Sequence, residues 1–198
     1  MAKATIATRS ATPEDAEHLA QLVNAASDGL SYYLWERTAG PGETAWDVGQ
    51  RRARREEGSF SYRKAMIAQI GGSVAGCLIG YPLPDEPEPI DAELPAMFVP
   101  LQELENHACG TWYVNVLATY PAYRRQGVAS HLLALAKSAA ERTGRRGLSI
   151  IVADTNAPAR RLYELSGFRQ TADRAMVKEG WQGPGTRWLL LAKPLGRR

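Results

Sequence analysis

The sequence is poor in cysteine, in long apolar runs and in charge of one sign, and each shortage excludes a class of protein. Two cysteines among 198 residues, Cys77 and Cys109, are too few for a disulfide framework. No apolar run approaches the roughly 20 residues that cross a bilayer, and no charged head precedes a long apolar segment at the N-terminus. The formal net charge of +3 is too small to argue for a nucleic acid or a membrane. We therefore expect a cytoplasmic protein without either partner.

Two common phosphate-binding patterns are missing as well. The sequence contains neither the G-x-x-x-x-G-K-[ST] loop nor a G-x-G-x-x-G turn directly after a strand. The composition is that of an ordinary globular protein, with 44% hydrophobic and 23% charged residues. A chain of this length buries one good core, so we expect one domain over residues 3–195.

The most informative stretch is 111–143, where a strand, a tight loop and a helix follow one another. Residues 111–119 are rich in β-branched and aromatic side chains, and Gly110 and Pro121 bound them, which predicts a strand. Pro121 ends any regular ladder. From Val128 the apolar residues recur at helical spacing, which predicts a helix with one buried face.

The junction between this strand and this helix suits an anion. The first turn of a helix has amide groups without an intrahelical acceptor, and its dipole places partial positive charge there. Arg124 and Arg125 add full charges just upstream, and Gly127 lets the backbone approach a ligand closely. The sequence therefore predicts a phosphate site at this junction.

Two motifs in this half of the chain resemble those of the GNAT superfamily of N-acetyltransferases. Arg124-Arg125-Gln126-Gly127-Val128-Ala129 matches the acetyl-CoA-binding signature [RQ]-x-x-G-x-[GA]. The downstream segment from Asn156 to Phe168 matches a second pattern, N-x-x-A-x-x-L-Y-x-x-x-G-F. The resemblance covers nearly the whole chain.

The resemblance implies an α/β (α+β) fold in a single GNAT-type domain. We expect a mixed, mostly antiparallel twisted sheet with helices on both faces and a central strand pair that splays apart for pantetheine. It also implies acetyl-CoA as co-substrate and no metal. The expected cofactor-binding residues are the strand backbone, the loop and helix start, and two residues of the second motif: Val116, Leu117, Ala118, Arg124, Arg125, Gln126, Gly127, Val128, Ala129, Ser130, Asn156 and Tyr163.

The rest of the chain supplies the other expected elements. Strands are predicted at 3–9, 61–70, 73–81, 148–152, 168–177 and 187–194, with Gly71-Gly72 as a hairpin turn. A helix capped by Thr12 should run to about residue 26, a polar one capped by Thr44 over 44–57, and another over 156–166. Segment 27–58 is expected to be a variable substrate-side region. Segment 83–108 is an insertion with a weak helical pattern that Pro100 interrupts.

The catalytic residues that we predict are Tyr163 and Asn115. Tyr163 follows Asn156 by seven residues, close to two helical turns, so both side chains should leave one face of the helix. In relatives this tyrosine reaches the CoA sulfur, and a phenol remains a proton donor at neutral pH. Without the resemblance, Tyr163 reads as a core residue packed under Phe168.

The general base is the open part of this chemistry. Many relatives carry a glutamate on the central strand, but here the strand offers Asn115, which cannot take a proton. A water relay is one solution. Other groups able to accept a proton are found outside the strand, although each also fits a surface position: Glu36, Glu103, Glu105 and His107.

We expect an acetyl-CoA-dependent N-acetyltransferase acting on a primary amine of a small molecule or a peptide. The alternative is a non-catalytic module that binds acetyl-CoA as a sensor or interaction partner. The run Arg51-Arg52-Ala53-Arg54-Arg55 reads as a solvated helix face, because Glu56 and Glu57 follow at once. A homodimer, formed through the last strands or through 94–108, is the remaining expected partner.

Overall fold

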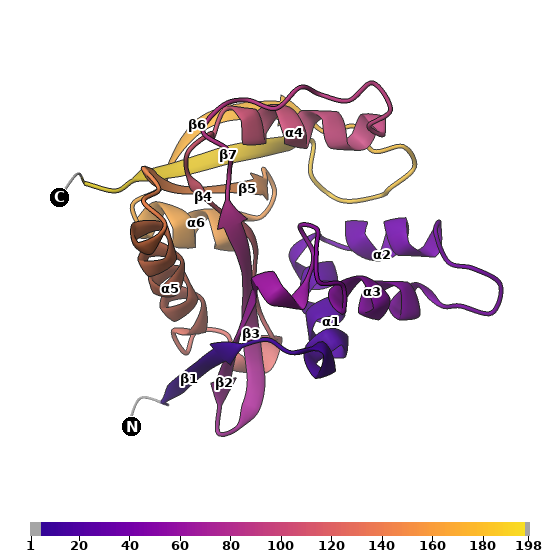
Figure 1. Ribbon diagram of the computed structural model, residues 1–198, viewed down its shortest axis with the longest axis horizontal. Coiled ribbons are helices and arrows are strands. Elements are labelled where there is room, and N and C mark those ends of the chain that lie inside the picture. The colour runs from indigo at the N-terminus through magenta and orange to yellow at the C-terminus, as the bar shows by residue number, and fades with distance from the viewer. Residues whose placement is uncertain (1–4, 197–198) are drawn as a thin grey trace. The chain divides into compact units, whose positions relative to one another are not determined.

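The computed structural model of the protein describes residues 5–196. Within them, seven strands form one sheet in the order β1-β2-β3-β4-β5-β7-β6. The β1–β2, β2–β3, β5–β7 and β6–β7 pairs are antiparallel, whereas β4 and β5 pair in parallel. Six α-helices accompany this mixed sheet along the described chain, as Figure 1 shows. The predicted α/β fold class is thus confirmed. The splay of β4 from β5 stays a prediction.

The chain divides into two compact units. Unit 1 contains the residues up to Gly80 together with Asn115–Ala134, and unit 2 contains Tyr81–Val114 together with the residues from Leu135 onward. Strand β4 (Trp112–Thr119) and helix α5 (Val128–Arg142) therefore each contribute residues to both units.

Unit 1 holds the first three strands, β1 (Ile6–Ser10), β2 (Ala65–Ile70) and β3 (Ser73–Pro82). The predicted turn is confirmed: Gly71 and Gly72 have φ of 59° and 82°, which side chains with a Cβ rarely adopt. The second strand begins four residues later than predicted, because residues 62–64 form the 3-10 helix η2. Ser61 accepts from the Arg63 amide and starts that turn. Lys3 and Ala4, predicted as part of the first strand, lie outside the described residues.

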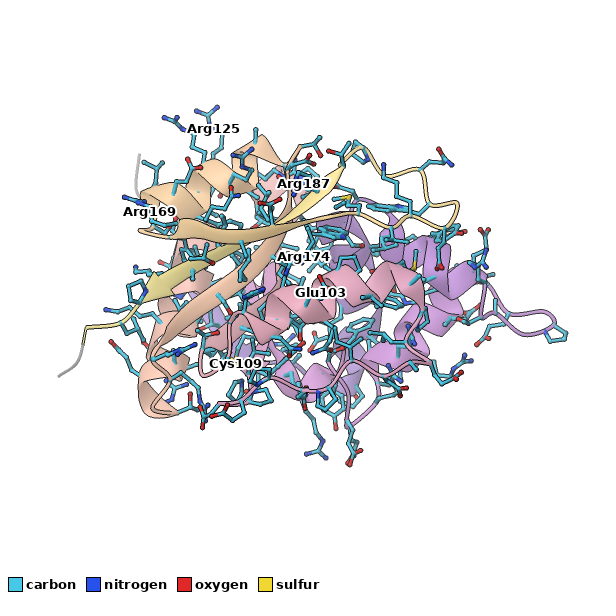
Figure 2. The ribbon with its side chains drawn as sticks, turned by 90° about the horizontal axis from the view of Figure 1, so that it is seen from above. Glu103, Cys109, Arg125, Arg169, Arg174 and Arg187 are labelled. Atoms are coloured by element: carbon cyan, nitrogen blue, oxygen red, sulfur yellow. The ribbon has the colours of Figure 1, made fainter. Side chains whose placement is uncertain are left out.

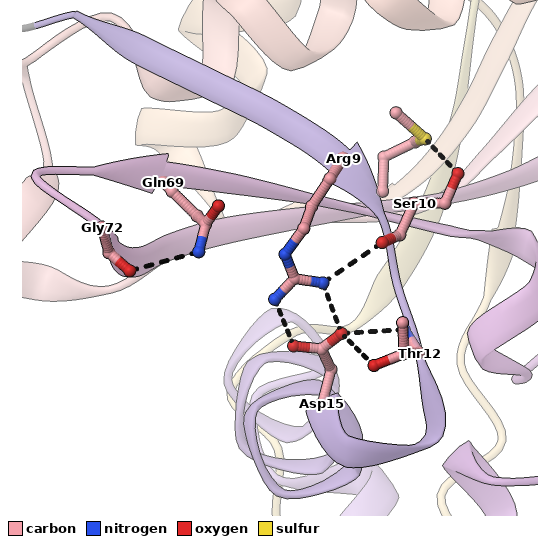
Figure 3. Close-up of polar contacts among 7 residues, drawn as sticks. Arg9, Ser10, Thr12, Asp15, Gln69 and Gly72 are labelled. Carbon is pink, nitrogen blue, oxygen red and sulfur yellow. Dashed lines mark hydrogen bonds and ion pairs between the residues drawn. The ribbon is translucent and has the colours of Figure 1, made fainter.

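An ion pair fixes the passage from β1 into the first helices of unit 1. Thr12 precedes the 3-10 helix η1 (Pro13–Asp15), which continues into α1 (Ala16–Ala26) as predicted. Arg9 donates to both carboxylate oxygens of the buried Asp15, at 2.7 Å each, and the Thr12 amide donates to the same carboxylate at 2.8 Å (Figure 3). The Arg9 guanidinium lowers the pKa of Asp15.

Helices α2 (Leu30–Glu36) and α3 (Ala45–Ala53) occupy the predicted substrate-side segment. Thr44 caps α3 as predicted, since the Asp47 amide donates to its hydroxyl at 3.2 Å. The helix ends at Ala53 rather than residue 57, and Gly58 with φ of 91° lies in the loop that follows. One core joins the helices of unit 1 to its strands, with Leu19, Trp35, Val48, Ile67, Cys77 and Val116 among its buried members.

Unit 2 holds helix α4 (Val99–Asn106), strand β5 (Gly147–Ala153), helix α6 (Ala157–Leu165) and the strands β6 (Arg169–Ala175) and β7 (Arg187–Pro194). The prediction that Pro100 interrupts a helical pattern is wrong. Pro100 occupies the first turn of α4, where its missing N–H costs no helical bond. The short 3-10 helix η3 (Ala96–Phe98) leads into it. Leu104 and Ala108 anchor α4 in a core with Leu83, Tyr113 and Leu190.

Across residues 5–196, none of the helices combines the length and the apolar character that crossing a membrane requires.

Candidate active site

Strand β4 directs alternate side chains into the core of unit 1. Val116 and Ala118 are each 8% exposed and belong to that core. Leu117, which points to the opposite face by strand alternation, is only partly buried. A ligand that follows residues 116–118 would therefore meet peptide groups rather than these two side chains.

Because Gly76 on β3 has no side chain, the backbone of β4 near Ala118 can lie close to it. A Cβ added at Gly76 would lie 2.3 Å from the Ala118 carbonyl oxygen and 3.2 Å from Val128 Cγ1. Any larger residue would push β4 and the start of α5 away. The sequence gives no signal for this role, because the contact joins positions more than forty residues apart.

After β4 the chain forms the 3-10 helix η4 (Pro121–Tyr123) and then the tight loop 124–127. Arg124 has extended backbone with φ of −62° and ψ of 154°. Arg125 and Gly127 then take left-handed conformations, with φ of 62° and 88°. The Gln126 side chain folds back and donates to the Ala122 carbonyl at 3.0 Å. Loops that alternate in this way turn successive amides toward one point, where an anion can sit.

Helix α5 begins with amides that nothing in the described chain satisfies. Its first intrahelical bond runs from the His131 amide to the Gly127 carbonyl at 2.9 Å, so the amides of Val128, Ala129 and Ser130 have no helical acceptor. No side chain within residues 5–196 accepts from these three amides. Gly127 itself has no side chain with which to cap them. Such unsatisfied donors suit a phosphate, and the phosphate site at this junction stays a prediction.

Arg124 and Arg125 stand exposed beside these amides, and neither forms an ion pair within the described chain. Figure 2 shows the Arg125 side chain extending outward from the ribbon. Both charges are therefore available to a polyanion. Thr119, the last residue of β4, adds a buried hydroxyl oxygen that has no hydrogen-bond partner among residues 5–196.

A polar group that the sequence did not indicate holds this loop to helix α1. The Tyr120 hydroxyl donates to Gln21 at 2.8 Å and lies 2.9 Å from His18 Nδ1. Burial raises the pKa of Tyr120 to about 12, so the phenol keeps its proton near neutral pH. The Tyr120 amide also donates to the Ala75 carbonyl at 2.9 Å.

The second motif places Asn156 differently from the sequence prediction. Asn156 is the N-cap of α6, and its side-chain oxygen accepts from the Ala159 amide at 3.2 Å. It therefore lies before the helix, with φ of −80° and ψ of 66°, rather than on a helical face shared with Tyr163. The argument from seven-residue spacing is wrong for this residue, since that spacing orients side chains only inside a helix.

Tyr163 is almost fully buried, with 4% of its surface exposed. Its ring lies 5.8 Å from that of Phe168, so the packing contact weighed from the sequence is present. The hydroxyl, however, makes no hydrogen bond with any residue of the described chain. Burial raises the pKa of Tyr163, which keeps the phenol protonated. The ring of Tyr163 is therefore part of the core, and its hydroxyl can still donate a hydrogen bond to a ligand.

The candidate bases have distinct surroundings. In unit 1, the Asn115 amide donates to the Ser59 carbonyl at 3.3 Å, and Glu36 is exposed on α2. In unit 2, Glu103 of α4 forms an ion pair with Arg174 of β6, and Figure 2 shows the two side chains pointing toward each other. The His107 ring nitrogen Nε2 lies 3.0 Å from the same guanidinium. Glu105 differs from the other candidates in its titration, because burial raises the pKa of its carboxyl to about 7.

Four aromatic residues of α2 and β4 divide into two groups by burial. Trp35 and Trp112 are 2% and 7% exposed and belong to the interior, whereas Tyr32 and Tyr33 are only partly buried. Within residues 5–196 no three histidine, cysteine, aspartate or glutamate side chains gather closely enough to hold a metal ion.

Comparison with protein families gives one match. The profile of the Acetyltransferase (GNAT) family matches residues 29–168, which include both motifs. A search of curated proteins finds no match.

Solved structures of similar fold cover nearly the whole chain. An acetyltransferase shares 20% identity, with a TM-score of 0.65, and the alignment covers 96% of this chain and 100% of that one. An N-acetyltransferase from Staphylococcus aureus Mu50 shares 19%, with a TM-score of 0.61 and coverage of 94% and 99%. A GNAT family acetyltransferase from Elizabethkingia anophelis with acetyl-CoA bound shares 18%, with a TM-score of 0.57 and coverage of 98% and 100%. At these identities the likeness concerns the fold.

Proposed function

The chain belongs to the acetyltransferase (GNAT) family, and we propose that it transfers the acetyl group of acetyl-CoA to a primary amine of a small molecule or peptide. The observation that carries this proposal is the start of α5. Among residues 5–196, three amides there have no acceptor, and two arginines without ion-pair partners stand next to them. The pyrophosphate of CoA supplies the anionic oxygens that such a group binds.

In this proposal the backbone of β4 and the loop hold the donor substrate. The amides from Gln126 to Ser130 bind the pyrophosphate, and Arg124 and Arg125 contribute charge. The peptide groups of Val116, Leu117 and Ala118 lie along the pantetheine arm and orient the thioester carbonyl. The core positions of Val116 and Ala118 favour this role, because their side-chain packing fixes the position of the strand.

Tyr163 supplies the proton donor for the departing thiolate. Its free hydroxyl supports this role, as does the raised pKa that keeps it protonated. Asn115 then has a polar, non-ionising role on β4, because its amide cannot accept a proton. General-acid help of this kind is worth about 10² to 10⁴ in rate.

The acceptor is a small molecule or peptide rather than a nucleic acid, and the setting is the cytoplasm. One member of the arginine run supports the first point, since Arg51 forms an ion pair with Glu43. Self-association through 94–108 cannot use Leu104, because this side chain is fully buried in unit 2. The last strands remain the other surface for a homodimer, and the mass from light scattering tests it.

The experiment that tests the function is an acetyl-transfer assay. The purified protein is incubated with acetyl-CoA and a panel of primary amines, and free thiol is followed with a thiol reagent. Amine-dependent thiol release above the rate without protein is the expected result. Tight acetyl-CoA binding in calorimetry without thiol release for any amine would instead establish the non-catalytic sensor.

A further inference from the structure

A pocket that the proposed function does not use lies at the C-terminal end of α5. Its volume is about 650 Å³, within the range of sites that bind small molecules. The end of α5, the turn into β5 and the chain after β7 form its walls. All of its lining residues belong to unit 2, whereas the open helix start at Gly127 belongs to unit 1.

Backbone hydrogen bonds fix the walls of this pocket. The Arg145 amide donates to the Ala140 carbonyl at 2.8 Å, and Gly144 has φ of 65°, so α5 ends in a Schellman turn. The Leu195 amide donates to the Arg146 carbonyl at 3.0 Å, which ties the chain after β7 to the residues that follow this turn. The two walls are therefore joined by main-chain bonds.

Three arginines line the pocket, and two of them have no ionic partner. Arg145 is held in place, because its Nη1 donates to the Leu83 carbonyl at 3.1 Å and to Asp85 at 2.9 Å. Its Nε is buried without a partner among residues 5–196, so the protein does not use all of its donors. Arg142 and Arg146 are exposed, and neither forms an ion pair with any described residue.

The acidic residue in the pocket wall does not cancel these charges. Glu141 is paired with Lys137, four residues earlier on α5, at 3.5 Å. Arg145 is balanced in the same way by Asp85. The charges of Arg142 and Arg146 therefore remain uncompensated at this pocket.

The helix end explains one of these two arginines but not both. A cation in the last turn of a helix interacts favourably with the helix dipole, and this is sufficient reason for Arg142. Arg146 lies beyond the turn, directly before β5, where the dipole of α5 gives no such reason. Two like charges at one pocket repel each other, and an anion bound between them removes the repulsion.

We propose that this pocket binds a small phosphomonoester. Such a group carries about two negative charges at pH 7, which matches the two uncompensated arginines. Guanidinium groups bind phosphate oxygens in pairs, and Ser138 adds a hydroxyl to the wall. The pocket is larger than a phosphate group alone, and Leu195 offers an apolar surface to the organic part of the ligand. The proposal is independent of acetyl transfer, because no residue of the proposed donor site lines this pocket.

The test is an NMR titration of the isotope-labelled, full-length protein with phenyl phosphate at low salt. The amide signals of Gly144, Leu195 and Gly196 report on the pocket, and the Gly127 amide reports on the start of α5 in the same spectra. We expect saturable shifts of the three pocket signals. Benzoate keeps the ring but carries one charge, and inorganic phosphate lacks the ring, so each should bind at least about tenfold more weakly.

Two double variants test the arginines. Arg142→Gln/Arg146→Gln removes both uncompensated charges, and the pocket signals should then report an affinity lower by at least about tenfold. Arg142→Lys/Arg146→Lys keeps the charges but loses the planar forks, so its affinity should be intermediate. The matched control Arg124→Gln/Arg125→Gln removes the same charge from the other end of α5, and the pocket signals should titrate within about twofold of wild type.

Four results would overturn the proposal. They are pocket signals that phenyl phosphate does not shift in the wild type, wild-type affinity in Arg142→Gln/Arg146→Gln, equal losses in both Gln variants, and equal affinity for benzoate. A thermal melt checks that the variants fold. Should the Gln variant of the pocket not fold, the Lys variant decides, since loss of the forks must weaken the binding. No readout here uses acetyl transfer, so failure of the acetylation assay leaves the result unchanged.

Discussion

Helices α5 and α6 both follow a strand of the central sheet, yet their first turns are completed in different ways. At α6, the Asn156 side chain accepts from the Ala159 amide and closes the helix start. At α5, the preceding residue is Gly127, and the first three amides have no acceptor in the described chain. A helix start is thus available to a ligand only where the protein does not cap it. In the function that we propose, α5 binds acetyl-CoA through its backbone, and α6 contributes the side chain of Tyr163.

The largest effect is expected from Gly127→Val, which fills the open helix start. Valine at a φ of 88° is strained, and its branched side chain occupies the space that the phosphate needs. We expect acetyl-CoA affinity to fall by about 100-fold, or about 2.7 kcal/mol, in calorimetry. Gly144→Val is the matched control, because Gly144 also has positive φ, at 65°, and meets nothing within 4 Å. Unchanged affinity in Gly127→Val would remove the phosphate from this loop.

Tyr163→Phe tests whether α6 contributes a side chain to the chemistry. The ring and its packing on Phe168 remain, and only the free hydroxyl is lost. We expect kcat to fall at least about tenfold with little change in acetyl-CoA affinity, because the donor acts on the departing thiolate. A variant with wild-type kcat, measured where chemistry limits turnover, would make Tyr163 a packing residue alone.

Arg124→Gln tests the charge beside the open helix start. Arg124 is exposed, so its contribution is screened by salt, and we expect about a threefold loss of affinity at low ionic strength that shrinks as salt is added. Arg142→Gln, at the other end of α5, removes the same charge at a distance from the loop. Equal losses in the two variants would show a general effect of net charge.

Asn156→Ala removes the side-chain cap from the start of α6. Loss of the cap should cost about 1 kcal/mol of unfolding free energy, measured by denaturant titration, while Asn156→Ser retains most of it. Acetyl-CoA affinity should stay within twofold in both. A clear loss of affinity in Asn156→Ala would show that the residue contacts the ligand, as the second motif predicts.

Asp15→Asn tests the ion pair between Arg9 and Asp15 at the start of α1. The Arg9 guanidinium lowers the pKa of Asp15, so the pair stabilises the fold above the unfolded pKa of about 3.9 and loses this effect as pH falls through the lower folded value. We expect Asn to cost about 1 kcal/mol at pH 7, a modest figure because Arg9 is 39% exposed. The difference from wild type in denaturant titrations should shrink as the pH falls below the unfolded pKa of about 3.9. A constant difference would point to packing instead.

The sequence predicted those elements whose signals are local. The Gly71-Gly72 turn, the Thr44 cap, strand β4 and helix α5 each depend on residues a few positions apart. The errors have local causes too, since Pro100 can begin a helix as well as break one, and Asn156 can cap a helix as well as extend it.

Other parts of the site depend on contacts that no short pattern encodes. The closeness of Gly76 to Ala118 follows from the pairing of strands, and the raised pKa of Glu105 follows from burial by distant segments. Glu105 could be named as one of four candidate bases, but only its surroundings distinguish it from Glu103 on the same helix.

The division of the chain has a consequence for fragments of this protein. Unit 1 and unit 2 are each assembled from two separate stretches, and the boundaries at 114/115 and 134/135 fall inside β4 and α5. No single cut releases either unit whole, and any split or circular permutation must leave these two elements intact. The loop at Gly127 belongs to one unit and Tyr163 to the other. A fragment that contains either unit alone would therefore lack part of β4 and part of α5.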